Sequence, residues 1–449
     1  MTLFAKTAAI GAALSLQCLA IQPAAAQDTD LGKAISADYD ASLGEIFLDF
    51  HKNPELSYKE TRTAGIIAKE WRDAGWKVTE KVGGTGVVAV MKNGDGPTLM
   101  LRADMDGLPL VEDSGLAYKS TATQVSIDGQ EKPVMHACGH DVHITSLIGT
   151  ARQLSARKDK WQGTIVLIAQ PAEERIGGAK MMMDDGLYTR FPKPDLAMAF
   201  HVSADTPTGK LALGEGISYS SVDTVDIIVH GVGAHGASPH RGKDPILMGS
   251  QIVMGLQTIV SRQVAPLKPA VITVGSFHAG LKHNIISDKA VLQLTVRSDE
   301  EETRKKLLEG IKRVATNVGR MNGLPDDKLP EVKVSHENTP AVYNDAAATK
   351  RVVAVFEKRF GKDILDNKPR EGMGGEDFAY FVAPNTDVPG VYFAVGGTPQ
   401  ADFDAEKAGG KPVPSHHSPF FKVAPRESIT LGTEAMTAAA LDFLAPKTN

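Results

Sequence analysis

The stretch Thr164-Ile165-Val166-Leu167-Ile168-Ala169-Gln170 decides the fold of this sequence, because its aliphatic and β-branched side chains are typical of a strand in the protein core. Four further runs of strand character alternate along the chain with segments in which apolar residues recur at helical spacing. The strands are predicted at residues 86–91, 98–103, 196–202 and 391–395, and the helices at 39–76, 144–154, 346–360 and 428–443. This alternation predicts an α/β domain with a central, mostly parallel sheet between helices.

A different pattern begins after Gly216. Strand, helix, two strands, helix and strand follow one another, which is the order of a ferredoxin-like sandwich. These elements are predicted at residues 222–230, 245–260, 270–277, 290–298, 301–321 and 333–335. We therefore expect an inserted α+β domain at residues 217–334, between the two parts of the first domain at residues 27–216 and 335–449.

Residues 1–26 have the pattern of a secretory signal peptide. Lys6 precedes an apolar, alanine-rich run at residues 8–21, and an Ala-x-Ala cleavage site ends at Ala26. A buried N-terminal helix is the alternative, and a lipoprotein centred on Cys18 is disfavoured because Gln17 stands where a small residue is required. No later apolar stretch reaches the roughly 18–20 residues that span a bilayer. We expect a periplasmic or secreted protein without a membrane partner.

The composition excludes some partners. The 449 residues include 49 lysines and arginines against 54 aspartates and glutamates, which gives a net charge of −5. No dense basic run suits nucleic acid, and the chain is long enough for two domains with separate cores. A small molecule is therefore the expected ligand.

Cleavage of the signal peptide would leave Cys138 as the only cysteine, in a compartment where thiols normally pair as disulfides. Such a thiol is either buried and inert or held by a partner such as a metal. Cys138 and His140 lie in the run MHACGHDVH (135–143), and at this spacing both can face one metal ion, while a thiolate can also bridge two. Because a short Cys-x-His also occurs by chance, this run alone leaves both interpretations open.

Two adjacent acids follow the core strand at residues 164–170. Glu173 and Glu174 are costly at the end of a buried strand unless a positive charge lies nearby, and a metal would supply it. A solvated loop with two surface acids is the alternative. Since ligands gather beyond the carboxyl ends of strands in open α/β sheets, we expect one cluster there. Its candidates are Asp104, Cys138, Glu173, Glu174 and His201, and a further loop carries His416 and His417.

Five motifs then resemble, in order, those of the co-catalytic metallopeptidase family of aminoacylases and carboxypeptidases. They are LRADMDGLP (101–109), MHACGHDVH (135–143), QPAEE (170–174), GGEDF (374–378) and HSP (417–419). The branch of hippurate hydrolases and plant indoleacetate-amino acid hydrolases is the most similar. The resemblance spans nearly the whole mature chain, and it implies a catalytic α/β domain with an inserted lid that usually also makes the dimer. We therefore expect a homodimer or a higher homo-oligomer.

The resemblance also implies roles for individual residues. Two divalent ions, zinc or manganese, would be held by Cys138, His140, Glu174, His201 and His417. Glu173 would be the general base, and Asp104 and Asp106 would support the site from behind the ligands. The following Ser-Pro favours His417 over His416 as the ligand.

The inserted domain carries the run HGVGAHGASPH (230–240), whose glycines formally match a dinucleotide-binding fingerprint. We reject this interpretation, because Pro239 delays the helix and the next strand has no terminal acid for a ribose. The resemblance implies instead that His235 reaches the site of a neighbouring subunit and stabilises the oxyanion, and that Asn284 contacts the carboxylate end of the substrate. Simple packing of His235 in a glycine-rich turn is the alternative.

The function predicted from these residues is hydrolysis of the amide bond of N-acyl amino acids, either hippurate-like or fatty-acyl conjugates. A dipeptidase or carboxypeptidase would use the same metals and base. A metal-bearing binding protein without turnover is a third hypothesis. Glu173 argues against it, because a binder needs no base beside the ligand Glu174.

Overall fold

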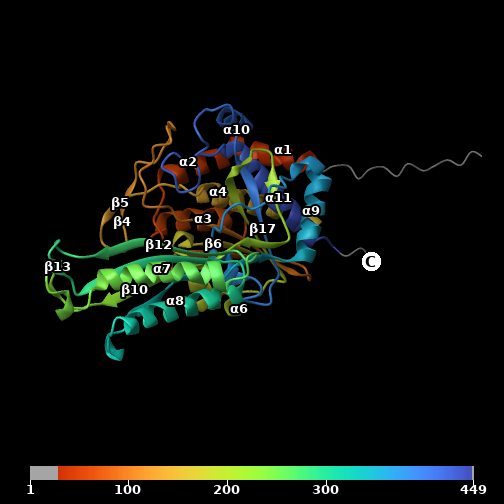
Figure 1. Ribbon diagram of the computed structural model, residues 1–449. Coiled ribbons are helices and arrows are strands. Elements are labelled where there is room, and N and C mark those ends of the chain that lie inside the picture. Colours follow the sequence, from red (N-terminus) through yellow and green to blue (C-terminus); the bar gives the residue numbers. More distant parts are fainter. Residues whose placement is uncertain (1–28, 447–449) are drawn as a thin grey trace, which may run out of the picture.

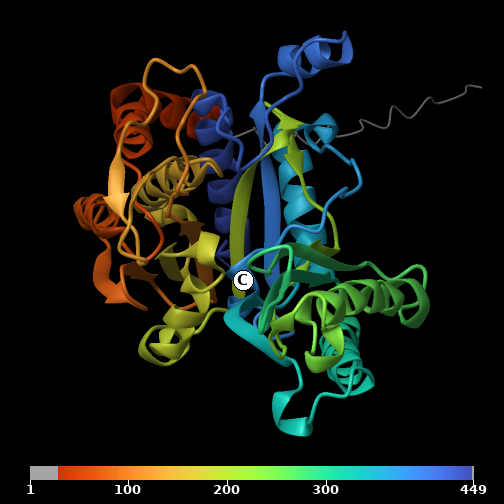
Figure 2. The same ribbon diagram turned by 60° about the vertical axis from the view of Figure 1, so that its left-hand side comes forward.

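The computed structural model describes residues 29–446, which form a larger α/β unit and a smaller α+β unit (Figure 1). Figure 2 shows the smaller unit, coloured green to teal, lying beside the larger one. The predicted signal peptide at residues 1–26 lies outside the described residues. Among the helices of residues 29–446, none is long and apolar enough to cross a membrane.

The larger unit is built on a seven-stranded sheet with the strand order β1-β2-β6-β3-β7-β17-β8. The middle strands β6, β3, β7 and β17 run parallel, whereas β1, β2 and β8 pair antiparallel. Their bounds are β1 (Lys77–Val82), β2 (Gly86–Asn93), β3 (Thr98–Asp104), β6 (Gly163–Gln170), β7 (Leu196–Pro207), β8 (Leu211–Ala212) and β17 (Gly390–Thr398). The predicted mostly parallel sheet and its five strands are confirmed.

Successive residues of a strand point to opposite sides of its sheet, so this sheet has two apolar faces. Helices cover both of them. In β6, Ile165 and Leu167 face one apolar core, and Val166 and Ile168 face another. The first core is closed by α2 (Gly44–Lys52), α3 (Thr61–Asp73), α4 (His140–Ala156), α9 (Ala346–Phe360) and α11 (Pro425–Phe443). The second is closed by α5 (Gly178–Asp184), α6 (Leu187–Arg190) and the 3₁₀ segment η7 (Asp377–Phe381).

The N-terminal helical region differs in detail from the prediction. It begins with α1 (Thr29–Asp38), continues through a π-helical turn at Tyr39–Leu43 into α2, and breaks before α3. The earlier start has a physical reason, since Leu31 and Ile35 are buried and α1 packs on α11, a helix from the far end of the chain. The predicted interruption near Pro54 is confirmed.

The smaller unit is an antiparallel sheet of four strands in the order β12-β14-β10-β15. Two helices share its apolar core. The elements follow the chain as β10 (Ser221–His230), α7 (Pro245–Gln263), β12 (Ala270–Ala279), β14 (Lys289–Ser298), α8 (Glu301–Met321) and β15 (Glu331–Thr339). This is the predicted ferredoxin-like order. The domain boundaries at residues 217 and 334 stay predictions.

One buried arginine ties the first half of the larger unit to its second half. Arg102 on β3 is 1% exposed, and its guanidinium pairs with Asp104 at 2.6 Å, Glu376 at 2.7 Å and Asp377 at 3.4 Å. Glu376 and Asp377 arrive from the far end of the chain, after the inserted unit. Arg102 is therefore the cation around which the two halves close.

Replacing Arg102 with leucine is expected to lower the free energy of unfolding by about 3–5 kcal/mol, because three carboxylates lose their buried counter-ion. Urea unfolding of the metal-free protein measures this change. The matched control Arg62→Leu removes an exposed pair with Asp49 and costs less than about 1 kcal/mol. Equal losses in both variants would contradict the role assigned to Arg102.

Candidate metal centre and active site

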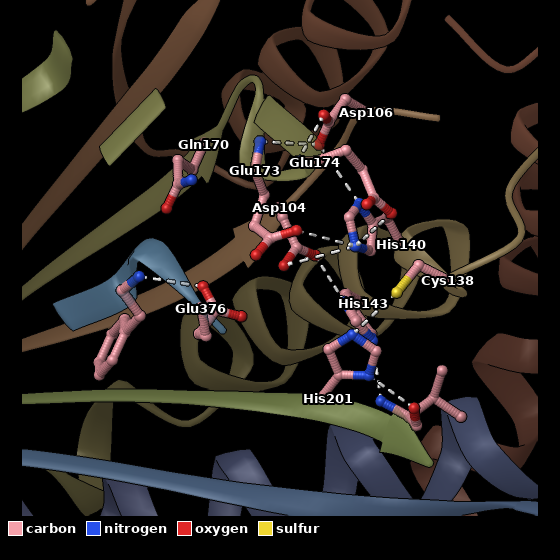
Figure 3. A network of polar contacts seen from close by, with 12 residues as sticks. Asp104, Asp106, Cys138, His140, His143, Gln170, Glu173, Glu174, His201 and Glu376 are labelled. Atoms are coloured by element: carbon pink, nitrogen blue, oxygen red, sulfur yellow. Dashed lines mark hydrogen bonds and ion pairs between the residues drawn. The ribbon is translucent and has the colours of Figure 1, made fainter. Parts of the chain in front are cut away.

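The five predicted metal ligands meet at the carboxyl edge of the parallel strands. Figure 3 shows four of them, Cys138, His140, Glu174 and His201. Their ligand atoms form overlapping groups in which every pair of atoms lies within 4.8 Å. These groups are Cys138–His140–His201, His140–Glu173–Glu174 and Cys138–Glu174–His417. The structure therefore brings together residues that are up to 279 positions apart, from Cys138 to His417 (417 − 138 = 279).

A left-handed glycine places Cys138 and His140 on the cluster. Gly139 has a φ of 85° at the N-terminus of α4, and a Cβ atom there would lie 2.3 Å from Val202 Cγ1. Only glycine fits both constraints. The Sγ atom of Cys138 consequently lies 3.3 Å from Nε2 of His201, and His140 is fully buried as the first residue of α4.

The two glutamates lie on a strained turn after β6. Ala172 has a φ of 49°, unusual for a residue with a side chain, and leads into the 3₁₀ turn η3 (Glu173–Arg175). The carboxylate of Asp106 accepts hydrogen bonds from the backbone N–H groups of Glu173 at 3.1 Å and Glu174 at 3.0 Å. Asp106 thus supports the site through the backbone of this turn.

The adjacent carboxylates occupy different places in the cluster. Glu174 Oε2 lies 3.3 Å from Nε2 of His417, and Glu174 Oε1 lies 3.8 Å from Nε2 of His140. Glu173 Oε2 lies 3.9 Å from the same His140 nitrogen, and Glu173 also forms a buried group with Glu376 and Asp377. Glu173 therefore stands between the ligands and an acidic pair.

Two of the ligand imidazoles are oriented by a contact of Nδ1, the ring nitrogen that does not face the cluster. Nδ1 of His201 donates a hydrogen bond of 2.6 Å to the carbonyl oxygen of Val202, so its Nε2 carries the free lone pair. Nδ1 of His140 lies 3.3 Å from Asp106 Oδ1, which likewise leaves Nε2 facing the cluster. A backbone carbonyl and a carboxylate are the usual partners behind metal-binding histidines.

His417 rather than His416 reaches the ligands. Its side chain is 56% exposed and its φ is 63°, which turns the imidazole toward Glu174. The neighbouring His416 is half-buried, and its Nε2 accepts a hydrogen bond of 3.0 Å from the N–H of Ala204. His416 therefore has a structural partner of its own.

Asp104 has more partners than the sequence indicated. It accepts a hydrogen bond of 2.5 Å from Nδ1 of His143 and pairs with Arg102, and its Oδ2 lies 3.8 Å from His140 Nε2. Nε2 of His143 in turn accepts from the N–H of Val202 at 2.8 Å. His143, Arg102, Glu376 and Asp377 were given no role from sequence, although all four lie inside the motifs quoted above.

Burial makes the metal-free cluster electrostatically unbalanced. It raises the pKa of Glu173 well above its usual range, an effect that Glu376 and Glu174 strengthen, and it raises the pKa of Glu174 to about 8. Burial also raises the pKa of the Cys138 thiol. Burial lowers the pKa of His140, but Asp104 and its neighbouring carboxylates outweigh this and raise it to about 10. Every one of these shifts indicates a need for positive charge.

The residues present fit divalent metal ions. Nε2 of His140 and Oε1 of Glu174 are buried and have no hydrogen-bond partner in the part of the chain that the structure describes. Buried polar atoms are normally satisfied, so a ligand that accepts their lone pairs is required. One thiolate with imidazoles and carboxylates is a donor set that suits zinc and tolerates manganese.

His235 and Asn284 lie elsewhere, on the smaller unit. They are neighbours there, because β11 (Ala234–His235) pairs with β13 (Ile285–Ile286) and the N–H of Gly236 donates to the carbonyl oxygen of Asn284. His235 is exposed, and within residues 29–446 no group of candidate metal ligands includes it. The structure does not join these two residues to the cluster of the same chain, and their roles stay predictions.

An α/β sheet with a buried thiolate, imidazole and carboxylate cluster at its carboxyl edge, beside a spare glutamate, defines a metal-dependent hydrolase. The chain belongs to peptidase family M20/M25/M40, whose sequence profile matches residues 100–440. The resemblance to the co-catalytic metallopeptidases is therefore confirmed. The predicted class of enzyme, a metal-dependent hydrolase of C–N amide bonds, is confirmed as well.

Three known proteins show the range of this family. The chain is 37% identical over 346 residues to a hippurate hydrolase of Campylobacter jejuni, covering 77% of this chain and 86% of that one. It is 37% identical over 350 residues to thermostable carboxypeptidase 2 of Saccharolobus solfataricus, covering 77% and 83%. The crystal structure of the YXEP protein of Bacillus subtilis, a dinuclear metal-binding peptidase of the M20 family, is similar with a TM-score of 0.72 and 28% identity, covering 92% and 99%.

Metal binding is expected to release protons, because His140 and Glu174 must be deprotonated before they coordinate. With pKa values raised to about 10 for His140 and about 8 for Glu174 in the metal-free protein, the apparent zinc affinity should rise with pH up to about pH 10, and more steeply below about pH 8. Calorimetric titration with zinc in two buffers of different ionisation enthalpy counts the protons released. A pH-independent affinity without proton release would contradict this account of the site.

Proposed function

We propose that the chain hydrolyses the amide bond of N-acyl amino acids, of the hippurate-like or fatty-acyl kind, with two divalent ions and Glu173 as general base. The observation that carries the proposal is the division of the adjacent glutamates. Both carboxylates lie near His140, but Glu174 faces His417 at 3.3 Å, whereas Glu173 forms a buried group with Glu376 and Asp377. The similarity to a hippurate hydrolase supports the choice of substrate.

Cys138, His140, Glu174, His201 and His417 would hold the two ions, zinc or manganese. Bound divalent ions would polarise the amide carbonyl and lower the pKa of an attacking water. Asp106 fixes the turn of both glutamates, and Asp104 holds His143 in place behind the ligands. These residues keep the site in one geometry before the substrate arrives.

Glu173 moves the proton in this scheme. Its carboxylate accepts a proton from the attacking water and returns it to the nitrogen of the leaving amino acid as the C–N bond breaks. A general base works best when its pKa lies near the operating pH.

The smaller unit serves as a lid in this proposal. His235 would stabilise the oxyanion in the site of a partner subunit, and Asn284 would contact the substrate carboxylate. The exposure of His235 on the lid supports a contact with a second copy of the chain. The proposal therefore includes a homodimer, and export to the periplasm or the medium through residues 1–26.

A carboxypeptidase or dipeptidase is the second candidate, because the relative from Saccharolobus solfataricus carries that name and the same metals and base would serve it. The two differ in the group on the acyl side of the scissile bond. A substrate panel of N-acyl amino acids and dipeptides separates them by which acyl-side groups are accepted.

Replacing Glu173 with glutamine is expected to lower kcat about 100- to 10,000-fold on N-acyl amino acids, because the variant cannot accept the proton. The metal content should stay at the wild-type level. Amine release and metal analysis measure both quantities after reconstitution with zinc or manganese. The matched control Glu174→Gln changes the neighbouring acid and should lose metal as well as activity.

The outcomes distinguish the hypotheses. A metal-loaded wild type that releases no amine from any acylated amino acid or peptide would favour the binding protein without turnover. Full activity in Glu173→Gln would remove Glu173 as the base.

A complementation experiment tests the shared site. The variants Glu173→Gln and His235→Gln are each expected to have low activity alone. The first lacks the base, and the second lacks the imidazole donated to the partner subunit. Mixed under conditions that exchange subunits, they should recover activity, since a hybrid dimer contains one site with both groups. A fully active monomer, or a mixture no better than its parts, would exclude the shared site.

A further inference from the structure

We propose that Glu60 is a positioning residue that sets the conformation of the turn carrying Glu173 and Glu174; its effect on turnover rests on the proposed function. Glu60 precedes α3 and is more than 100 positions away from both glutamates in the sequence, since 173 − 60 = 113. It belongs to no group of candidate metal ligands among residues 29–446.

Glu60 joins three segments of the chain through its carboxylate. It is 0% exposed. Oε1 accepts hydrogen bonds from the N–H of Ala172 at 2.8 Å and from the N–H of Tyr58 at 2.9 Å. Oε2 accepts one of 2.5 Å from the hydroxyl of Thr85, which lies between β1 and β2. The carboxylate is thus fixed from two other sides and presents Oε1 to the turn.

The hydrogen bond from Ala172 completes a pattern along the turn. The N–H groups of three successive residues, Ala172, Glu173 and Glu174, all donate to buried carboxylates. Glu60 takes the first, and Asp106 takes the other two. No backbone donor of this stretch is left to rotate freely, so the directions of the two glutamate side chains are set by two carboxylates.

Ala172 is the residue at which the turn most needs an external partner. Its left-handed φ of 49° is strained for a residue with a Cβ atom, and it is fully buried. The chain reverses there from the extended β6 into η3. A charge-assisted hydrogen bond at this N–H stabilises the one backbone conformation that points Glu173 and Glu174 at the cluster.

The two carboxylates are themselves connected. The hydroxyl of Ser57 donates a hydrogen bond of 2.6 Å to Oδ2 of Asp106, and Ser57 lies three positions before Glu60. The segment between α2 and α3 therefore holds both supports of the turn. A shift of this segment would move the proposed base and its neighbouring ligand together.

Filling space alone would not require a polar side chain at position 60. Within residues 29–446 no lysine or arginine forms a salt bridge with Glu60, and burial of an unpaired carboxylate is costly. An apolar residue of similar size would avoid this cost. A polar side chain is retained because one oxygen accepts from both Ala172 and Tyr58 while the other contacts Thr85.

The test compares Glu60→Leu, Glu60→Asp and Glu60→Gln with wild type in the full chain. Leucine removes the acceptor, and aspartate withdraws it by one methylene, so both should lower kcat per metal-loaded site, by about 10- to 100-fold for leucine. Glutamine keeps an acceptor oxygen for Ala172 and should restore kcat to near the wild-type value. KM should change little in all three variants.

Two readouts do not depend on turnover. Hydrogen exchange of the Ala172 amide should be fast in Glu60→Leu and slow in Glu60→Gln and wild type. Competition with a chelator should show weaker zinc binding in Glu60→Leu, because Glu174 shares the turn.

The matched control is Glu55→Leu. Glu55 also accepts two backbone hydrogen bonds, from Arg62 at 3.1 Å and Thr63 at 2.7 Å, but at the start of α3. The Glu55→Leu substitution should lower the melting temperature without changing kcat, zinc affinity or the hydrogen exchange of the Ala172 amide.

The proposal is overturned if metal-loaded Glu60→Leu has the kcat and Ala172 exchange of wild type. If Glu60→Leu does not fold, wild-type kcat and exchange in Glu60→Asp overturn it instead. Failure of the proposed function would be seen separately, as a wild type that cleaves no acylated amino acid. In that case exchange and zinc affinity still decide the role of Glu60.

Discussion

The rest of the structure depends on one electrostatic constraint, which is the burial of many carboxylates at one edge of the sheet. Arg102 neutralises Asp104 and Glu376 in the interior. Within residues 29–446 no arginine or lysine pairs with Glu173 or Glu174, whose neighbours are histidines, and burial raises the pKa of both glutamates. Folding alone would not favour this arrangement. It becomes favourable when divalent cations bind, so the architecture of the edge is best understood as a preformed receptor for positive charge.

The backbone around the cluster contains several left-handed residues, which place the charged side chains close together. Ligand side chains with strict directions are carried by short turns with left-handed residues, at Gly139, Ala172 and His417. Such turns are costly by themselves and require partners. Carboxylates supply these partners for Ala172 and its two successors, whereas a glycine such as Gly139 adopts the left-handed conformation without steric cost. At this turn, therefore, the strained residue Ala172 directly contacts a carboxylate that stabilises its conformation.

Much of this could be predicted from sequence, and the reason is local pattern. The strand at residues 164–170 and the βαββαβ order of the smaller unit follow from periodicity, and Cys138, His140 and Glu174 follow from motifs at strand ends. The supports could not be predicted in this way. His143 lies within a quoted motif, but its bond to Asp104 joins two elements, and no spacing between positions 104 and 143 indicates it. Tertiary contacts of this kind appear only once the sheet order is known.

One contact between the two units is exposed to solvent, unlike the buried contacts that support the site. Arg175, directly after the two glutamates, donates from Nε to Glu337 on β15 at 2.8 Å, with side chains 40% and 25% exposed. An ion pair this exposed contributes at most about 1 kcal/mol and breaks at small cost. The buried supports, by contrast, hold the turn in one conformation. This single contact can therefore break without disturbing the ligands, which is one requirement for an enzyme that closes over its substrate.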